Sequence, residues 1–236
     1  MSRPRYIRFL SRAAPLYDPV ANGMGFPKLW ETFAAIAAPE RGLSCLDVCT
    51  GTGGVALALA RRGARVVGVD AAPGMLVRAE RKARGQGLAG KIRLVRMDAR
   101  ALGFRDDSIP LVTCSMALHE MAEDERDRVL AELGRVSSPH VLVADYRVPP
   151  GRRAGWLFRA RRFYEYLESD DFEGYAGWDP AARLAAAELR VQTPRDVGAY
   201  RIWPCRVTKP RPSPLLPRPH HPAVAKRVVA PTPRHV

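Results

Sequence analysis

The chain has 236 residues and is strongly basic, with 38 Lys and Arg against 24 Asp and Glu and a formal net charge of +14. This length suffices for one domain with a substantial core, and no run approaches the roughly 20 apolar residues of a membrane-spanning helix. The basic N-terminal segment, residues 1–14, is interrupted by Arg and Pro and does not read as a secretory signal.

A glycine turn follows the first expected strand. Residues 46–54 (LDVCTGTGG) leave an apolar run, pass Asp47 and enter a turn that opens a helix. Such a turn lets a ligand approach the backbone, and the helix start offers unpaired N–H groups. The next apolar run, residues 66–69, ends on Asp70, where a carboxylate can accept from the two hydroxyls of a ribose. The pattern indicates an adenosine-containing cofactor on a doubly wound sheet.

Two cofactors compete for this turn. Residues 51–56 (GTGGVA) match the dinucleotide pattern G-x-G-x-x-G/A, which keeps a nicotinamide cofactor open. Asp47 argues for the other cofactor, because a carboxylate beside the turn repels a pyrophosphate. The amino group and sulfonium of S-adenosylmethionine are cationic instead. The charge pattern therefore favours the methyl donor.

The following elements alternate regularly. Pro73 suits the first turn of a helix over residues 73–84. Residues 92–96, 109–115 and 141–146 read as three more strands, with a charged helix over residues 123–136. This alternation predicts an α/β fold, a parallel sheet with helices on both faces. Directly after the strand at 92–96, Asp98 can accept from an adenine amino group and the Ala99 backbone can meet a ring nitrogen.

Three segments carry a resemblance to a known family: residues 17–22 (YDPVAN) with Leu29 and Trp30, the turn at 50–53 (TGTG), and residues 98–108 (DARALGFRDDS). On these, residues 15–206 resemble a class I S-adenosylmethionine-dependent methyltransferase, nearest to the C-methyltransferases of ubiquinone and menaquinone biosynthesis. The resemblance implies a Rossmann-like sheet of seven strands, mostly parallel, with the last strand antiparallel. It also implies methyl transfer from S-adenosylmethionine to a small-molecule acceptor, quinone-like or otherwise hydrophobic.

The cofactor-binding residues that we expect are Asp47, Cys49, Gly51, Gly53, Asp70, Ala71, Met75, Asp98, Ala99 and Ser115. We expect Gly51 and Gly53 to be glycines because a side chain there would occupy the cofactor's space. His119 follows the fourth strand and is a candidate general base, since imidazole can take a proton near neutral pH. A structural histidine is the alternative, and Glu120 and Tyr146 are weaker candidates.

The chain departs from the family at three places in this region. Cys49 stands where the turn usually has its first glycine, and Pro110 replaces an Asp that usually starts the fourth strand. Residues 117–121 (ALHEM) stand where quinone enzymes tend to carry a Gly-x-Arg-Asn stretch.

The insert at residues 151–178 mixes arginines with aromatic residues. We interpret it as an amphipathic helix over the active site, or as a lid that shapes the acceptor pocket.

The C-terminal part of the domain, which we place at residues 15–207, should complete the sheet. Residues 189–192 and 200–207 are the expected last strands, the final one antiparallel between the fifth and sixth. Pro204 lacks an N–H, so a bulge or break is expected there. From Arg206 onward the chain has seven Lys and Arg, no acid and eight prolines. Residues 208–236 are therefore expected to lack fixed structure, with at most weak contact with an anionic membrane and no specific nucleic-acid binding.

The four cysteines, Cys45, Cys49, Cys114 and Cys205, show no C-x-x-C pairing, and no partner ligands lie near Cys45 and Cys49. We therefore expect no metal site, and reduced thiols in a cytoplasmic protein. Two other functions stay open at this point. One is an NAD(P)-dependent oxidoreductase, and the other is a non-catalytic methyltransferase-like binding protein.

Overall fold

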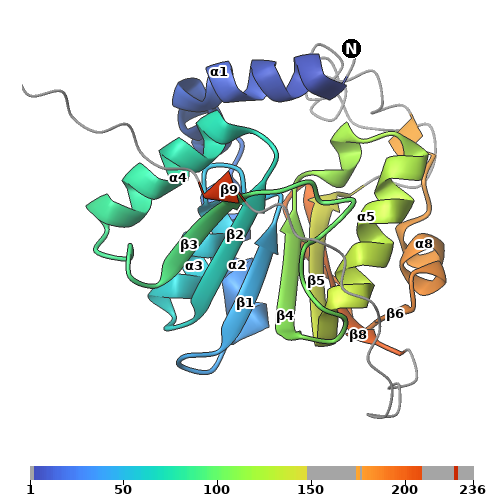
Figure 1. The fold of residues 1–236 in the computed structure, drawn as a ribbon. Coiled ribbons are helices and arrows are strands. Elements are labelled where there is room, and N and C mark those ends of the chain that lie inside the picture. Colours follow the sequence, from blue (N-terminus) through green and yellow to red (C-terminus); the bar gives the residue numbers. More distant parts are fainter. Residues whose placement is uncertain (1–2, 148–173, 176, 209–225, 228–236) are drawn as a thin grey trace, which may run out of the picture.

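The computed structural model describes residues 3–147, 174–175, 177–208 and 226–227. Most of the expected insert at 151–178 and most of the tail at 208–236 lie outside these residues. Within them the chain forms one mixed sheet between helices (Figure 1). The helices are α1 (Arg3–Gly23), α2 (Phe26–Ala37), α3 (Gly54–Arg61), α4 (Pro73–Gly85), a short 3-10 helix η1 (Leu118–Glu120), α5 (Glu123–Val136) and α8 (Pro180–Ala186).

The sheet has the strand order β6-β8-β5-β4-β1-β2-β3-β9, and β7 also pairs with β8. Strands β1 to β5 are mutually parallel, whereas β8 is antiparallel to β5 and β6. The bounds are β1 Ser44–Val48, β2 Arg65–Asp70, β3 Ile92–Arg96, β4 Ile109–Ser115, β5 Ser137–Tyr146, β6 Leu189–Val191, β7 Arg195–Val197, β8 Tyr200–Val207 and β9 Lys226–Arg227. The predicted doubly wound fold is confirmed, with two short strands, β7 and β9, beyond the seven expected.

Helices cover both faces of the sheet, as the alternation predicts. In Figure 1, α2 and α3 lie behind the sheet and α5 lies in front of it. Helix α3 is buried along Gly54 to Ala60, because its sequence GVALALA is apolar all round and lies between the sheet and α2. Helix α5 carries three acidic residues in its first turn, where the helix dipole favours them. No helix in the described ranges is long and apolar enough to cross a membrane.

The expected break at Pro204 is wrong. Strand β8 pairs with β5 in continuous register, with Pro204 opposite Leu142. The carbonyl of Pro204 accepts the N–H of Gln192 at 2.8 Å, so the proline nitrogen faces the same side, away from β5. On that side of β8, β6 pairs with residues 205–207 and β7 pairs with residues 200–202, so Pro204 lies between the two pairings. The missing N–H therefore removes no bond to β5.

Two expected boundaries also need correction. Helix α1 runs without interruption from Arg3 to Gly23, so the structure has no break at residue 15 between a basic segment and the domain. In the tail, which was expected to lack fixed structure, Lys226 and Arg227 form β9 and pair antiparallel with Arg96 and Val95 of β3.

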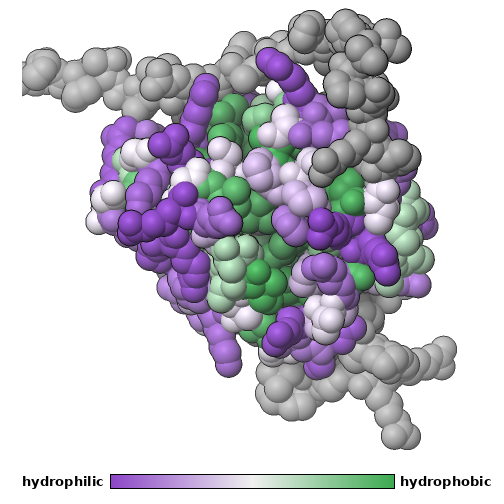
Figure 2. Space-filling view, turned by 90° about the horizontal axis from the view of Figure 1, so that it is seen from below, coloured by the Kyte–Doolittle hydropathy of each residue, from purple (hydrophilic) through white to green (hydrophobic). Residues whose placement is uncertain are grey.

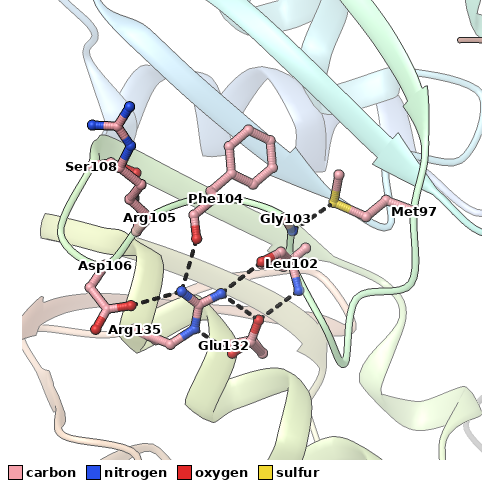
Figure 3. Close-up of polar contacts among 9 residues, drawn as sticks. All are labelled: Met97, Leu102, Gly103, Phe104, Arg105, Asp106, Ser108, Glu132 and Arg135. Atoms are coloured by element: carbon pink, nitrogen blue, oxygen red, sulfur yellow. Dashed lines mark hydrogen bonds and ion pairs between the residues drawn. The ribbon is translucent and has the colours of Figure 1, made fainter. Parts of the chain in front are cut away.

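The connection between β3 and β4, residues 97–108, contains no helix and is held by one arginine (Figure 3). Arg135 of α5 donates to the carbonyls of Leu102 and Phe104 at 2.7 and 2.8 Å and pairs with Asp106 at 2.8 Å. Glu132 binds the same guanidinium and accepts the N–H of Leu102 at 2.6 Å. The hydrogen bonds with Glu132 above all, and with Asp106, raise the pKa of Arg135 although burial acts in the opposite direction. The connection is thereby fixed to α5.

The end of the sheet that lies opposite α1, where the parallel strands begin, is partly apolar at its surface. Viewed from below, apolar residues gather in the middle between hydrophilic flanks (Figure 2). A groove of about 480 Å³ lies among the N-terminal ends of β1, β2 and β3 and one face of α4. Leu76 and Ile92 are among its apolar lining residues, while Arg65, Lys91 and Arg93 make it basic.

At Gly74 the backbones of helices α1 and α4 come into close contact. A Cβ added to Gly74 would lie 2.1 Å from the carbonyl oxygen of Ser11. Pro15 lies inside α1, and it cannot donate to Ser11, the residue four positions earlier. Ser11 O therefore lacks its usual partner from within the helix, at the place where α4 approaches most closely.

We predict that Gly74→Ala destabilises the protein by about 1–3 kcal/mol, because the methyl group must displace backbone of α1. Gly85→Ala is the matched control in the same helix, since no atom lies within 4 Å of a Cβ there. It should be neutral or slightly stabilising. Urea denaturation checks both variants. Equal stability of the two would show that α1 and α4 are not closely packed at Gly74.

Candidate functional site

A cleft lies at the C-terminal ends of β1, β2 and β4, under α1. The helices that follow β1 and β4 pack on opposite faces of the sheet, so this is the switch point at which doubly wound folds bind ligands. The cleft consists of two adjoining pockets of about 60 Å³ each, which share Leu10, Cys49, Asp70, Ala117 and Glu120. Helix α1 contributes Leu10 and Tyr17 to the first pocket and Tyr6, Ile7 and Leu10 to the second.

The glycine turn forms one wall of the first pocket. Gly51 has φ +53° and no atom within 4 Å of an added Cβ, so its open side faces the cleft. Gly53 has φ +82°, but its Cβ would lie 3.1 Å from the Cβ of Ala79 on α4. Gly53 therefore does not line the cleft, and our reason for a glycine there was wrong. The small residue needed for packing against the ring of Trp30 is Gly54, which does line the cleft.

Cys49 occupies the position where the family usually has glycine, and its φ is +55°. Met116, after β4, has φ +52° and lines the same pocket. Left-handed backbone at a residue with a side chain is strained, and such strain gathers at functional sites. Both residues lie where strands end in the cleft. The other thiols behave as core residues, since burial raises the pKa of Cys45 and of Cys205 to about 12.

Asp70 lies between the two pockets and lines both. One of its oxygens accepts the N–H of Gly51 and the other accepts the N–H of Ala72, each at 2.8 Å. These bonds hold the carboxylate at the end of β2 and bind it to the glycine turn. A carboxylate oxygen can accept more than one hydrogen bond, so this geometry is compatible with the expected ribose contact.

Asp47 differs from the expectation, because it is only 1% exposed and does not line the cleft. Its oxygens accept the hydroxyls of Thr50 at 2.6 Å and Thr113 at 2.7 Å. Burial raises its pKa to about 6, although these hydrogen bonds and one from the Ala56 backbone act in the opposite direction. Asp47 therefore holds the turn from the buried side, through Thr50. Electrostatic attraction between its carboxylate and a cationic ligand in the cleft would act without direct contact.

Of the remaining expected residues, four line the cleft and one does not. Met75 and Ser115 line the first pocket, and Ala71 and Ala99 line the second. Asp98 lines neither pocket. Its carboxylate receives the Arg100 guanidinium at 2.6 Å, and its side chain is 42% exposed. The predicted adenine contact of Asp98 therefore has no support in this geometry.

Asp18 is a residue whose role the sequence did not reveal. It lies on α1 and accepts from Thr52 of the glycine turn at 2.7 Å and from Arg78 and Lys82 of α4 at 2.8 and 2.7 Å. Burial alone would raise its pKa, but these hydrogen bonds outweigh burial and lower it. Asp18 thus fastens α1 over the cleft. Its partners lie 34 to 64 residues away in the chain, so no local pattern could identify them.

His119 lies deeper than expected. Only 3% of it is exposed, and it lines neither pocket, whereas its neighbour Glu120 lines both. Its Nδ1 lies 2.6 Å from the buried carboxylate of Asp145, and its Nε2 lies 3.8 Å from Glu120. The rings of Tyr146 and Tyr175 pack edge-on against it. Among the residues that the structure describes, no cluster of His, Cys, Asp or Glu could hold a metal ion.

The two pockets fit the parts of S-adenosylmethionine. The second pocket is largely apolar, with Ala72, Met97, Ala99 and Met121 available to hold an adenine ring. The first pocket offers the polar groups of Thr50, Thr52 and Ser115 beside Gly51, as the methionine part requires. Asp70 stands between the pockets, where the ribose would lie.

Comparison with known proteins agrees with this cleft. Residues 45–140 match the model of a methyltransferase domain. A demethylmenaquinone methyltransferase of Thermus thermophilus is 37% identical over 156 residues, which is 63% of this chain and 69% of the relative. One of Clavibacter sepedonicus is 32% identical, covering 80% of this chain and 86% of the relative. The chain is an S-adenosylmethionine-dependent methyltransferase.

The fold agrees with solved methyltransferase structures. A magnesium protoporphyrin IX methyltransferase from Synechocystis with bound SAH superposes with a TM-score of 0.60. The match covers 78% of this chain and 84% of that one at 17% identity. The comparisons give no support to the alternative of a nicotinamide-dependent oxidoreductase. The family therefore supports S-adenosylmethionine as the cofactor of this methyltransferase.

We predict that Asp70→Ala weakens S-adenosylhomocysteine binding by at least tenfold, because charge-assisted hydrogen bonds to a ribose contribute about 1.5–3 kcal/mol each. Asp98→Ala is the matched control and should change the dissociation constant by less than threefold. Calorimetric titration of both variants measures the effect. Thermal unfolding must accompany it, since Asp70 also binds Gly51 and Ala72. An unchanged dissociation constant in folded Asp70→Ala would contradict the assigned ribose position.

Proposed function

We propose that this methyltransferase transfers the methyl group to a ring carbon of a lipophilic quinol. The main support is the relatives named above, demethylmenaquinone methyltransferases that align with up to 86% of their own length. A ubiquinone/menaquinone biosynthesis C-methyltransferase of Geobacter sulfurreducens, 31% identical over 209 residues, adds to it. All three names describe quinone methylation.

The surroundings of the cleft are consistent with a flat, apolar acceptor. Aromatic rings follow one another from the cleft into the interior in the order Tyr17, Phe26, Tyr200, Tyr146 and His119, with centroids 4.8 to 6.5 Å apart. Such rings favour stacked or edge-on contacts with another ring. The insert at 151–178, which we propose as the substrate lid, lies largely outside the described residues. Two of its described residues, Tyr175 and Trp178, are buried and pack against each other, and the ring of Tyr175 also packs against His119.

Methylation at carbon requires that a proton leaves the acceptor. The cofactor supplies a methyl group made electrophilic by its sulfonium. We propose that the proton of a quinol hydroxyl reaches Nε2 of His119 by way of Glu120, which lines both pockets and lies 3.8 Å from Nε2. Nδ1–H of His119 donates to Asp145, which fixes the tautomer. Removal of that proton places electron density on the ring carbon, which would then take the methyl group that the bound cofactor supplies, with the electrons of the carbon–sulfur bond remaining on sulfur. Release of the ring proton to water would restore the aromatic ring, and the proton held by His119 would return to the oxygen.

The substrate test is a comparison of acceptors with labelled donor. A reduced naphthoquinone or benzoquinone that lacks the ring methyl should gain label at carbon, whereas its ring-methylated counterpart should gain none. Product analysis by mass spectrometry locates the methyl group. Transfer only to oxygen, or transfer to unrelated amines and carboxylic acids but to no quinol, would contradict the proposal.

We predict that His119→Asn lowers kcat by about 10²–10⁴-fold, the usual contribution of a positioned base, and leaves S-adenosylhomocysteine affinity within threefold. Asparagine retains a donor toward Asp145 and should preserve the fold. A base role also predicts that the wild-type acid limb of the pH–kcat profile disappears in the variant. If kcat falls but the acid limb stays, His119 is structural.

A further inference from the structure

The outward side of α1 exposes large apolar side chains. Among the described residues, the large exposed apolar side chains are Phe9, Leu16, Val20 and Val77. Three of the four lie on α1, and Val77 lies on α4, the helix against which α1 packs. Leu16 is 70% exposed.

The three exposed apolar residues of α1 form one stripe. Positions 9, 16 and 20 are spaced by seven and four residues, so they lie on the same side of the helix. Another side of the helix carries Leu10, Ala14 and Tyr17, which face the cleft and the rest of the domain. Helix α1 therefore has apolar residues on both sides, one packed inside and one at the surface.

Cations flank the outward stripe. Arg5, Arg8 and Arg12 are all exposed on α1. The single acidic residue of the helix, Asp18, is turned inward and bound by Arg78 and Lys82. The exposed side of α1 thus combines apolar side chains with positive charge and no negative charge. This is the composition of helices that lie in the surface of an anionic bilayer, with arginines at the headgroups and apolar side chains below them.

We propose that the outward face of α1, formed by Arg5, Phe9, Arg12, Leu16 and Val20, binds the surface of an anionic lipid membrane. Helix α1 lies across the end of the sheet where the cleft opens (Figure 1), so the bound membrane adjoins the cleft. A lipophilic acceptor then passes from the bilayer along α1 to the methyl group. That delivery step rests on the proposed function, whereas the membrane-binding face rests on α1 alone.

The test measures binding of the full chain to vesicles of phosphatidylglycerol and phosphatidylcholine by co-sedimentation, without acceptor or cofactor. Wild type should bind mixed vesicles, bind pure phosphatidylcholine at least tenfold more weakly, and lose affinity at high salt. Phe9→Gln with Leu16→Gln keeps the charge and should weaken binding to mixed vesicles at least tenfold. Both residues are exposed, so thermal unfolding should not change.

Charge is tested by a matched pair of double variants. Arg5→Gln with Arg12→Gln should weaken binding at least tenfold, whereas Arg190→Gln with Arg206→Gln removes as much charge from exposed positions at the β6–β8 edge and should have little effect. Equal loss in the two pairs would show that net charge alone drives binding. Unchanged binding of the Phe9 and Leu16 variant, or complete loss on truncation after Thr208, would overturn the proposal. None of these results depends on the identity of the acceptor.

Discussion

The cleft depends on a buried carboxylate that is satisfied by two threonines. A buried ionisable group must be hydrogen-bonded, or it destabilises the fold by several kcal/mol. Asp47 meets this condition through Thr50 in the glycine turn and Thr113 on β4, so its burial binds the turn to the neighbouring strand. Asp70, one strand further, holds Gly51 by its N–H. Two carboxylates at the ends of adjacent parallel strands thereby shape the backbone that lines the cleft.

The position of α1 over the cleft depends on the same backbone. Asp18 binds Thr52 of the turn and two cations of α4, so α1 is attached to the same backbone that Asp47 and Asp70 hold. The close contact of Gly74 with Ser11 brings α1 down onto α4. One side of α1 therefore closes the cofactor site, and its other side is left for the surface that we assign to the membrane. Cofactor binding and acceptor delivery thus share one helix.

Much of the fold could be predicted because its signals are local. Strands β3, β4 and β8 and helix α5 begin and end where apolar runs and charge patterns indicate. Pro204 was misjudged because its effect depends on which side of β8 its nitrogen faces, a property set by the partners β6 and β7. Gly53 and Asp47 were expected to meet the cofactor, but they contact Ala79 and Thr113, which come from other elements. The spacing of glycines in the sequence indicates that a turn binds a ligand, but it does not indicate which residues of the turn face that ligand.

The carboxylates beside the glycine turn should make this cleft bind a methyl donor rather than a dinucleotide. Calorimetric titration of the wild-type chain with S-adenosylhomocysteine and, in parallel, with NAD⁺ and NADH tests it most directly. We expect saturable binding of S-adenosylhomocysteine at one site per chain and no heat of binding from either nicotinamide. Saturable binding of NAD⁺ or NADH without binding of S-adenosylhomocysteine would contradict it.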